Sequence, residues 1–123
     1  MDWKKIKYFK REEFVCHHCG VEHMDEEFMQ MLDAARDQAG VAIGVSSGYR
    51  CPEYDKQVGG KDNHTTGKAA DLVVTTSRAR FEVLGALMDV GFKRIGIGST
   101  FIHVDICDEG EDKPTNVIWH YYT

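Results

Sequence analysis

Three side chains in the second half of the chain have types and spacing suited to binding a metal ion. His64 precedes Asp71 by seven positions in the segment HTTGKAAD, and His103 lies inside the apolar run FIHVD at 101–105. A catalytic zinc site takes three protein ligands, drawn from His, Asp, Glu and Cys, and leaves one position for water. Zinc held in this way lowers the pKa of that water to ~7 and polarises a carbonyl group.

Each of these residues also has an ordinary structural interpretation, as a hydrogen-bonded core histidine or as an aspartate at the end of a strand. Asp71 lies in the apolar segment AADLVV, where a carboxylate is costly to bury unless it is paired or bound to a metal. Alternation along a strand places Phe101, His103 and Asp105 on one face. Potential ligands in or beside two apolar strands favour a metal-binding cleft over a dry core.

Two main helices are predicted to support these strands. The first spans 24–40, where acidic residues follow Asp25, a suitable N-cap. The second spans 75–92, and its pattern predicts that Phe81, Leu84, Leu87 and Met88 face the core.

The remaining segments predict short strands joined by turns and one short helix. Strands outnumber long helices, so we expect an α+β fold: an antiparallel sheet flanked by two main helices, in a single domain over residues 1–123. The predicted strands are 41–47, 69–74, 94–98, 100–107 and 117–122.

Composition and charge exclude several functional classes. The hydrophobic fraction of 42% and the charged fraction of 28% are those of an ordinary globular protein. A net charge of −5 argues against nucleic-acid binding, and no apolar run approaches the ~20 residues that span a membrane. The first residues lack the pattern of a secretory signal peptide, so we expect cytoplasmic synthesis. A monomer is the expected oligomeric state.

Three motifs occur in a fixed order: SGYRCPEYDKQVGG at 47–60, HTTGKAAD at 64–71 and GIGSTFIHVD at 96–105. Together they resemble the zinc D-alanyl-D-alanine carboxypeptidase family of peptidoglycan peptidases, over about residues 8–107. The resemblance implies the Hedgehog/DD-peptidase fold and a zinc metallopeptidase that cleaves D-amino-acid-containing bonds in peptidoglycan stem peptides. Members act as carboxypeptidases or endopeptidases, some of them phage endolysins, so the site of action expected here is the bacterial cell wall or periplasm.

The resemblance also assigns roles to individual residues. His64, Asp71 and His103 match the three zinc ligands, and Arg50 matches the arginine that holds the substrate carbonyl or carboxylate. An always-charged guanidinium suits either task. Ser47 and Tyr49 are the other expected substrate-binding residues, although a turn or packing role would also explain them.

The chain departs from the family pattern at two positions. Asp62 stands where related enzymes commonly carry serine, and Thr100 stands where several branches carry the catalytic base. Asp105 is our expected catalytic replacement, because it shares a strand face with His103; it could instead orient a ligand imidazole. The missing acid leaves an alternative function, a cell-wall-binding module that retains zinc without turnover.

The segment CHHCG at 16–20 supplies a second set of potential ligands. A CxxC pair is half of a structural zinc site, and Cys51 and Cys107 are single. We expect packing or free thiols ahead of a second, structural zinc ion at Cys16 and Cys19; a disulfide and a zinc-knuckle interaction protein are further alternatives. His120 either lines the cleft or packs in the last strand.

Overall fold

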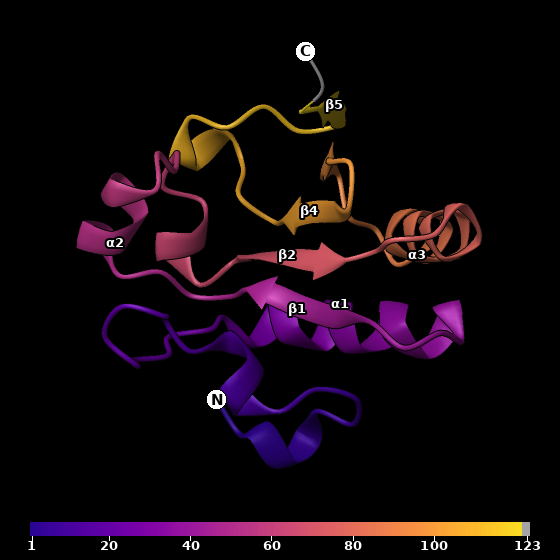
Figure 1. The fold of residues 1–123 in the computed structure, drawn as a ribbon, viewed down its shortest axis with the longest axis horizontal. Helices are drawn as coiled ribbons and strands as arrows, with labels where there is room; N and C mark the ends of the chain where they lie inside the picture. Colours follow the sequence, from indigo (N-terminus) through magenta and orange to yellow (C-terminus); the bar gives the residue numbers. More distant parts are fainter. Residues whose placement is uncertain (122–123) are drawn as a thin grey trace.

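The computed structural model describes residues 1–121, apart from the side chain of Glu109, and shows an α+β fold (Figure 1). None of the helices in the described part of the chain has the length and hydrophobicity of a membrane span. The helices are α1 (Glu26–Ala39), α2 (Pro52–Gln57) and α3 (Ser77–Asp89), with single 3-10 turns at Trp3–Lys5, Arg11–Phe14, His64–Thr66 and Glu109–Glu111. The strands are β1 (Gly44–Ser47), β2 (Ala69–Val73), β3 (Arg94–Ile97), β4 (Phe101–Asp105) and β5 (Val117–His120).

Helix α1 follows the prediction closely at both ends. The Asp25 carboxylate accepts a hydrogen bond from the Phe28 N–H at 3.0 Å, which satisfies one of the free donors at the helix start. Gly40 ends the helix with a φ of 68°, a left-handed conformation that glycine adopts without a steric penalty.

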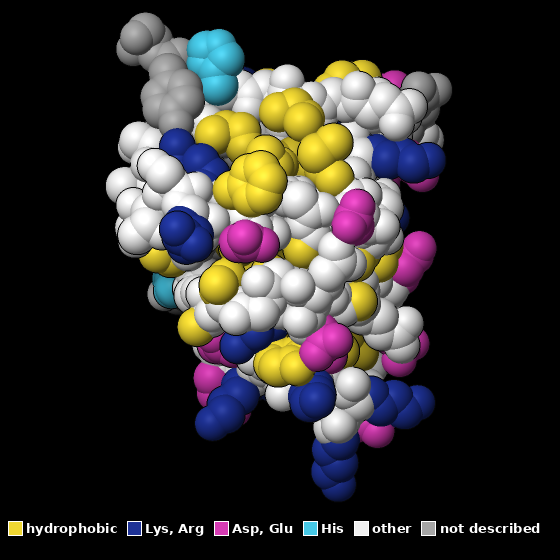
Figure 2. Space-filling view, turned by 90° about the vertical axis from the view of Figure 1, so that its right-hand side faces the viewer, with side chains coloured by type: hydrophobic (Ala, Val, Ile, Leu, Met, Phe, Trp, Pro, Cys, Tyr) yellow, Lys and Arg dark blue, Asp and Glu magenta, His cyan; other side chains and the backbone are white. Residues whose placement is uncertain are grey.

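The prediction for helix α3 was confirmed for Leu87, which is buried, and for Leu84, which packs partly buried against the core, but it was wrong for Phe81 and Met88. Phe81 and Met88 are 75% and 53% exposed, and the buried residues are Val83, Ala86 and Leu87. Helix α3 packs along α1, and its buried residues include the small Ala86. On the side of the molecule that carries α3, hydrophobic side chains therefore gather at the surface (Figure 2).

The five strands form one sheet in the order β1-β2-β4-β3-β5. The prediction of an antiparallel sheet was wrong for one pair: β5 runs parallel to β3, so the sheet is mixed. Because β4 ends beside the start of β3, the connection over 106–116 brings β5 into the sheet at that same end, and β5 then runs alongside β3. Tyr122, the last residue of the predicted strand, lies outside the described residues.

Alternation along the central strands separates a core face from a polar face. Residues with fully buried side chains, which join the helices in one hydrophobic core, are Ala70, Leu72, Ile102 and Val104. Asp71 and His103 alternate with them and so project from the opposite face. The candidate site therefore lies on the side of the sheet that the main helices leave uncovered.

Candidate metal centre

A row of paired residues across the sheet positions two of the candidate ligands. Asp71 of β2 lies opposite His103 of β4, and His103 lies opposite Gly96 of β3. Directly paired residues on neighbouring strands project to the same face. The His103 Nδ1 atom consequently lies 2.9 Å from Asp71 Oδ1.

The third candidate ligand comes from the turn that precedes β2. His64 is 3% exposed, and its Nε2 atom lies 3.5 Å from Asp71 Oδ1. Gly67 turns the chain back into β2 with a φ of 76°, and a Cβ atom there would lie 2.0 Å from the carbonyl oxygen of His23. The turn that aims His64 at Asp71 thus requires glycine.

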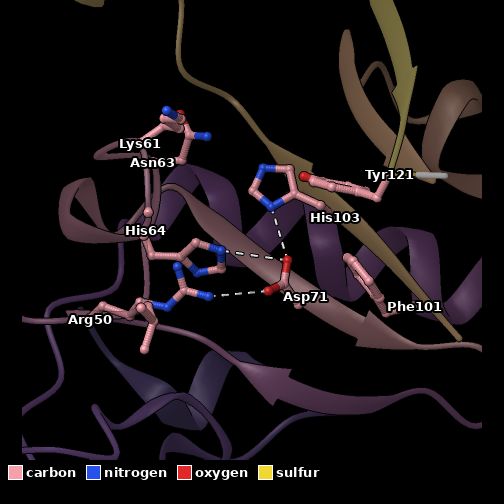
Figure 3. Close-up of a pocket in the computed structure, with 11 residues that line it drawn as sticks. Arg50, Lys61, Asn63, His64, Asp71, Phe101, His103 and Tyr121 are labelled. Carbon is pink, nitrogen blue, oxygen red and sulfur yellow. Dashed lines mark hydrogen bonds and ion pairs between the residues drawn. The ribbon is translucent and has the colours of Figure 1, made fainter. Parts of the chain in front are cut away.

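The three side chains converge at one point (Figure 3). One ligand atom from each of His64, Asp71 and His103 lies within 4.8 Å of the other two. Two imidazole nitrogens and a carboxylate oxygen form a common donor set of catalytic zinc sites. By chemistry and by mutual distance, these residues fit a zinc ion.

Each imidazole has one nitrogen that faces away from Asp71, and the hydrogen bond of that nitrogen selects the tautomer of the ring. His64 Nδ1–H donates to the carbonyl oxygen of Gly48 at 2.8 Å, and His103 Nε2–H donates to Asp105 Oδ2 at 2.7 Å. In their neutral forms, both rings then direct an unprotonated nitrogen toward Asp71. Such partners fix the orientation and basicity of metal-binding histidines.

Asp105 is enclosed behind His103. Its carboxylate is fully buried and also accepts hydrogen bonds from Arg94 Nε at 2.6 Å and from the Cys107 N–H at 3.1 Å. The expected role of Asp105 as catalytic base therefore finds no support in the geometry, because the carboxylate already accepts three hydrogen bonds and does not line the cavity. The arrangement favours the alternative role, orientation of His103.

Trp119 of β5 packs against both His103 and Arg94, the two side chains that bond to Asp105. Its ring centroid lies 5.6 Å from that of His103 and 5.0 Å from the guanidinium carbon of Arg94. Gly96 makes the approach feasible, because a Cβ atom there would lie 2.6 Å from Trp119 Nε1. The indole thereby keeps water from the back of His103.

The pKa of Asp71 is lowered at this site, whereas the pKa of His103 is raised. Burial raises the pKa of Asp71, but hydrogen bonds with His103 and His64 outweigh it and place the pKa well below its ordinary value. Burial lowers the pKa of His103, yet its bonds to Asp105 and Asp71 raise the pKa overall. Without metal, the site therefore stabilises a proton on His103, and that proton competes with a metal ion.

Arg50 lies beside the three ligands and is held by three acceptors. Its guanidinium donates to Ser47 Oγ at 3.2 Å, to Asp55 Oδ1 at 3.1 Å and to Asp71 Oδ2 at 3.4 Å. Asp55 is 1% exposed and was missed by the sequence analysis. It follows Arg50 by five positions, which is no regular helical pairing, so the sequence carries no signal for this contact.

A cavity of about 240 Å³ opens over the ligands. Its other polar lining residues include Arg50, Lys61 and Asn63, and its aromatic wall is Phe101 and Tyr121, whose ring centroids lie 5.2 Å apart. Tyr121 was also missed, although strand alternation places it on the face of Trp119. Burial and the charges of Asp71 and Asp105 raise the pKa of Tyr121, against a hydrogen bond with Trp119 that lowers it.

Comparison with known families agrees with this geometry. A family model described as peptidase M15 matches residues 7–105, most of the chain. The chain belongs to the peptidase M15 family. This family is of the zinc D-Ala-D-Ala carboxypeptidase type, so the protein is a zinc-dependent metallopeptidase. No curated protein matches the sequence significantly.

Three other predicted residues of this M15 peptidase lie outside the cavity lining. Ser47 is buried and supports Arg50, and Tyr49 is buried with its ring against that of His23 at 5.2 Å. Neither side chain lines the cavity, so their role in substrate binding stays a prediction. His120 is exposed on β5, where alternation gives the cavity Tyr121 instead.

Proposed function

We propose that this M15 peptidase holds its catalytic zinc ion with His64, Asp71 and His103 and hydrolyses a D-amino-acid-containing peptide bond of peptidoglycan. The observation that carries the proposal is the convergence of three ligand atoms beneath a cavity that also contains a fixed arginine. The Hedgehog/DD-peptidase fold is part of the proposal, and the mixed sheet with its site on the uncovered face is compatible with it.

A zinc ion at this position would supply water activation and polarisation of the scissile carbonyl. The chain's own residues supply orientation. Ser47 and Asp55 hold the Arg50 guanidinium beside Asp71, where it can bind the scissile carbonyl oxygen or a substrate carboxylate without reorganising. A donor fixed in advance stabilises developing negative charge more effectively than a mobile one.

The cavity suits the end of a stem peptide. Its volume of about 240 Å³ is small, and Arg50 and Lys61 give it two cationic groups that attract a carboxylate. Phe101 and Tyr121 offer an apolar wall to a methyl side chain such as that of D-alanine. These features support D-alanyl-D-alanine or a related D-amino-acid cross-link as the substrate, and action at the bacterial cell wall, as in a phage lysin.

We assign proton donation in this site to Tyr121, whereas the expected catalytic residue was Asp105. Among the described residues that line the cavity, Asp71 carries the only carboxylate. The Tyr121 hydroxyl, whose pKa is raised, stays protonated at neutral pH and lies where it can donate to the reacting carbonyl oxygen or leaving nitrogen. The lack of a second acidic group keeps the non-hydrolytic wall-binding module as the competing function.

Digestion of purified peptidoglycan and of synthetic stem peptides ending in D-Ala-D-Ala separates these functions. We expect zinc-dependent release of D-alanine or of new amino groups, measured by mass spectrometry, and its loss with chelator and in His103→Ala. His120→Ala is the matched control, since this histidine lies outside the cavity, and should retain activity. Tight binding to peptidoglycan without any product would support the binding module and contradict the enzyme.

A further inference from the structure

A second group of metal-binding side chains lies around the N-terminal turn, separate from the cavity. The sulfur atoms of Cys16, Cys19 and Cys51 all lie within 4.8 Å of one another. Cys16 and Cys19 belong to the turn CHHCG, whereas Cys51 lies directly before α2. The fold therefore brings a third thiol to a CxxC pair, which is the step that the sequence alone leaves open.

His18 provides a nitrogen beside Cys51. Its Nδ1 atom lies 3.5 Å from Cys51 Sγ, and its ring is stacked on that of Tyr54 with centroids 5.9 Å apart. The neighbouring His17 is directed elsewhere, because its Nε2 hydrogen bonds to the carbonyl oxygen of Ser46 at 2.9 Å. The three sulfur atoms, together with the imidazole nitrogen beside Cys51, offer the four ligands that a closed zinc site takes.

The backbone around the turn is arranged to stabilise the thiolate of Cys16. The Gly20 N–H donates to the carbonyl oxygen of Cys16 at 2.8 Å, and Gly20 has a φ of 72°, which closes the turn tightly. The Cys51 N–H donates to Cys16 Sγ at 3.4 Å. Burial raises the pKa of Cys16, but N–H groups of Cys51, Cys19 and His18 outweigh it and lower the pKa to about 6.

We propose that Cys16, His18, Cys19 and Cys51 bind a structural zinc ion, at a site distinct from the one at His64, Asp71 and His103. A closed four-ligand set rich in thiolate is typical of structural zinc, whereas a catalytic site keeps a position open. Cys107, the remaining cysteine, takes no part: it is buried and its sulfur lies 3.7 Å from Thr66 Oγ1.

The proposed ion connects the N-terminal turn to the segment that carries Arg50. That segment already makes two hydrogen bonds with the N-terminal part of the chain: Tyr49 N–H donates to the carbonyl oxygen of Phe14 at 2.9 Å, and His17 bonds to the carbonyl oxygen of Ser46. Cys51 follows Arg50 directly, so metal binding at Cys51 restrains the backbone on which the guanidinium depends. Structural zinc sites contribute directly to folding free energy.

Cobalt substitution distinguishes this site from the catalytic one, because only thiolate ligands give an intense sulfur-to-cobalt charge-transfer band. We expect His64→Ala/His103→Ala protein to retain about one zinc ion per chain and to show the band after exchange with cobalt. Cys51→Ser and the milder Cys19→Ser, at an exposed position, should lose the band and one zinc equivalent. Cys107→Ser is the matched control and should keep both the charge-transfer band and the zinc ion.

Three results would overturn the proposal. The first is that His64→Ala/His103→Ala protein with all cysteines as free thiols folds without zinc and shows no sulfur-to-cobalt band. The second is a band that persists in Cys51→Ser. The third is a disulfide among Cys16, Cys19 and Cys51 in freshly isolated protein, shown by thiol counting and peptide mapping, together with no zinc uptake after reduction.

Discussion

Replacement of Asp105 by asparagine should weaken zinc binding at the candidate catalytic site by about 10- to 100-fold, the cost typical of losing a partner of a metal-binding histidine. Such a change corresponds to about 1.4–2.7 kcal/mol of binding free energy. The prediction decides between the two roles considered for Asp105, orientation of His103 and general base.

The expected loss follows from hydrogen-bond donors and acceptors. Asparagine has one oxygen, whereas the Asp105 carboxylate accepts from Arg94 Nε and Cys107 N–H through Oδ1 and from His103 Nε2–H through Oδ2. With its oxygen kept by Arg94, the amide group would present N–H to His103 Nε2. The imidazole proton would then move to Nδ1, the atom that must face the metal.

The same replacement should lower the free energy of unfolding. Arg94 and Asp105 are both buried, and removing one partner of a buried ion pair costs about 3–5 kcal/mol. The assay must therefore be run well below the melting temperature of the variant. Competition with a chromophoric chelator gives the zinc affinity, and hydrolysis at saturating zinc gives kcat.

The two roles give opposite results. If Asp105 orients His103, the zinc affinity falls and saturating zinc restores most of the activity. If Asp105 is the general base, zinc affinity is unchanged and kcat falls by about 10²- to 10⁴-fold at every zinc concentration. The second result would refute the interpretation of the buried Asp105–His103 contact.

Three further predictions concern substrate binding, proton donation and pH. Arg50→Lys should reduce kcat/KM by about 10²- to 10³-fold with zinc content unchanged, because lysine cannot bond to Ser47, Asp55 and substrate together; wild-type kinetics would contradict the role. Tyr121→Phe should lower kcat by at least about 10²-fold without changing zinc affinity; an unchanged kcat would exclude proton donation. In zinc-free protein, the raised pKa of His103 gives stability that is complete below pH ~6.5 and is lost as pH rises through the folded pKa. The lowered pKa of Asp71 gives stability present above pH ~3.9 and lost in acid. Melting temperatures with chelator should therefore be highest between about pH 4 and 6.5, and the rise caused by zinc should grow with pH; a zinc effect independent of pH would contradict the competition.

Much of the fold follows from local patterns that the sequence displays. Helix α1 depends on Asp25, Gly40 and a regular apolar row, and each operates within one or two turns of chain. The grouping of His64 with Asp71 and His103 was predicted from motifs and strand alternation, and the structure brings the three together. Their role as zinc ligands remains a prediction.

The features that escaped prediction depend on contacts between distant segments. Helix α3 packs along α1 with Leu87 buried as predicted, but it leaves Phe81 and Met88 exposed despite their hydrophobic side chains. The parallel entry of β5 follows from the path of residues 106–116, and that path also brings Tyr121 to the cavity. The partner of Arg50, Asp55, is buried by the fold rather than by any periodicity in its own short helix.

The central claim is that His64, Asp71 and His103 hold a zinc ion. An anomalous difference map, recorded at the zinc absorption edge from crystals grown with zinc, tests it most directly. The account predicts a strong peak within bonding distance of His64 Nε2, an Asp71 carboxylate oxygen and His103 Nδ1. Zinc-saturated crystals with no peak among these three side chains would contradict it.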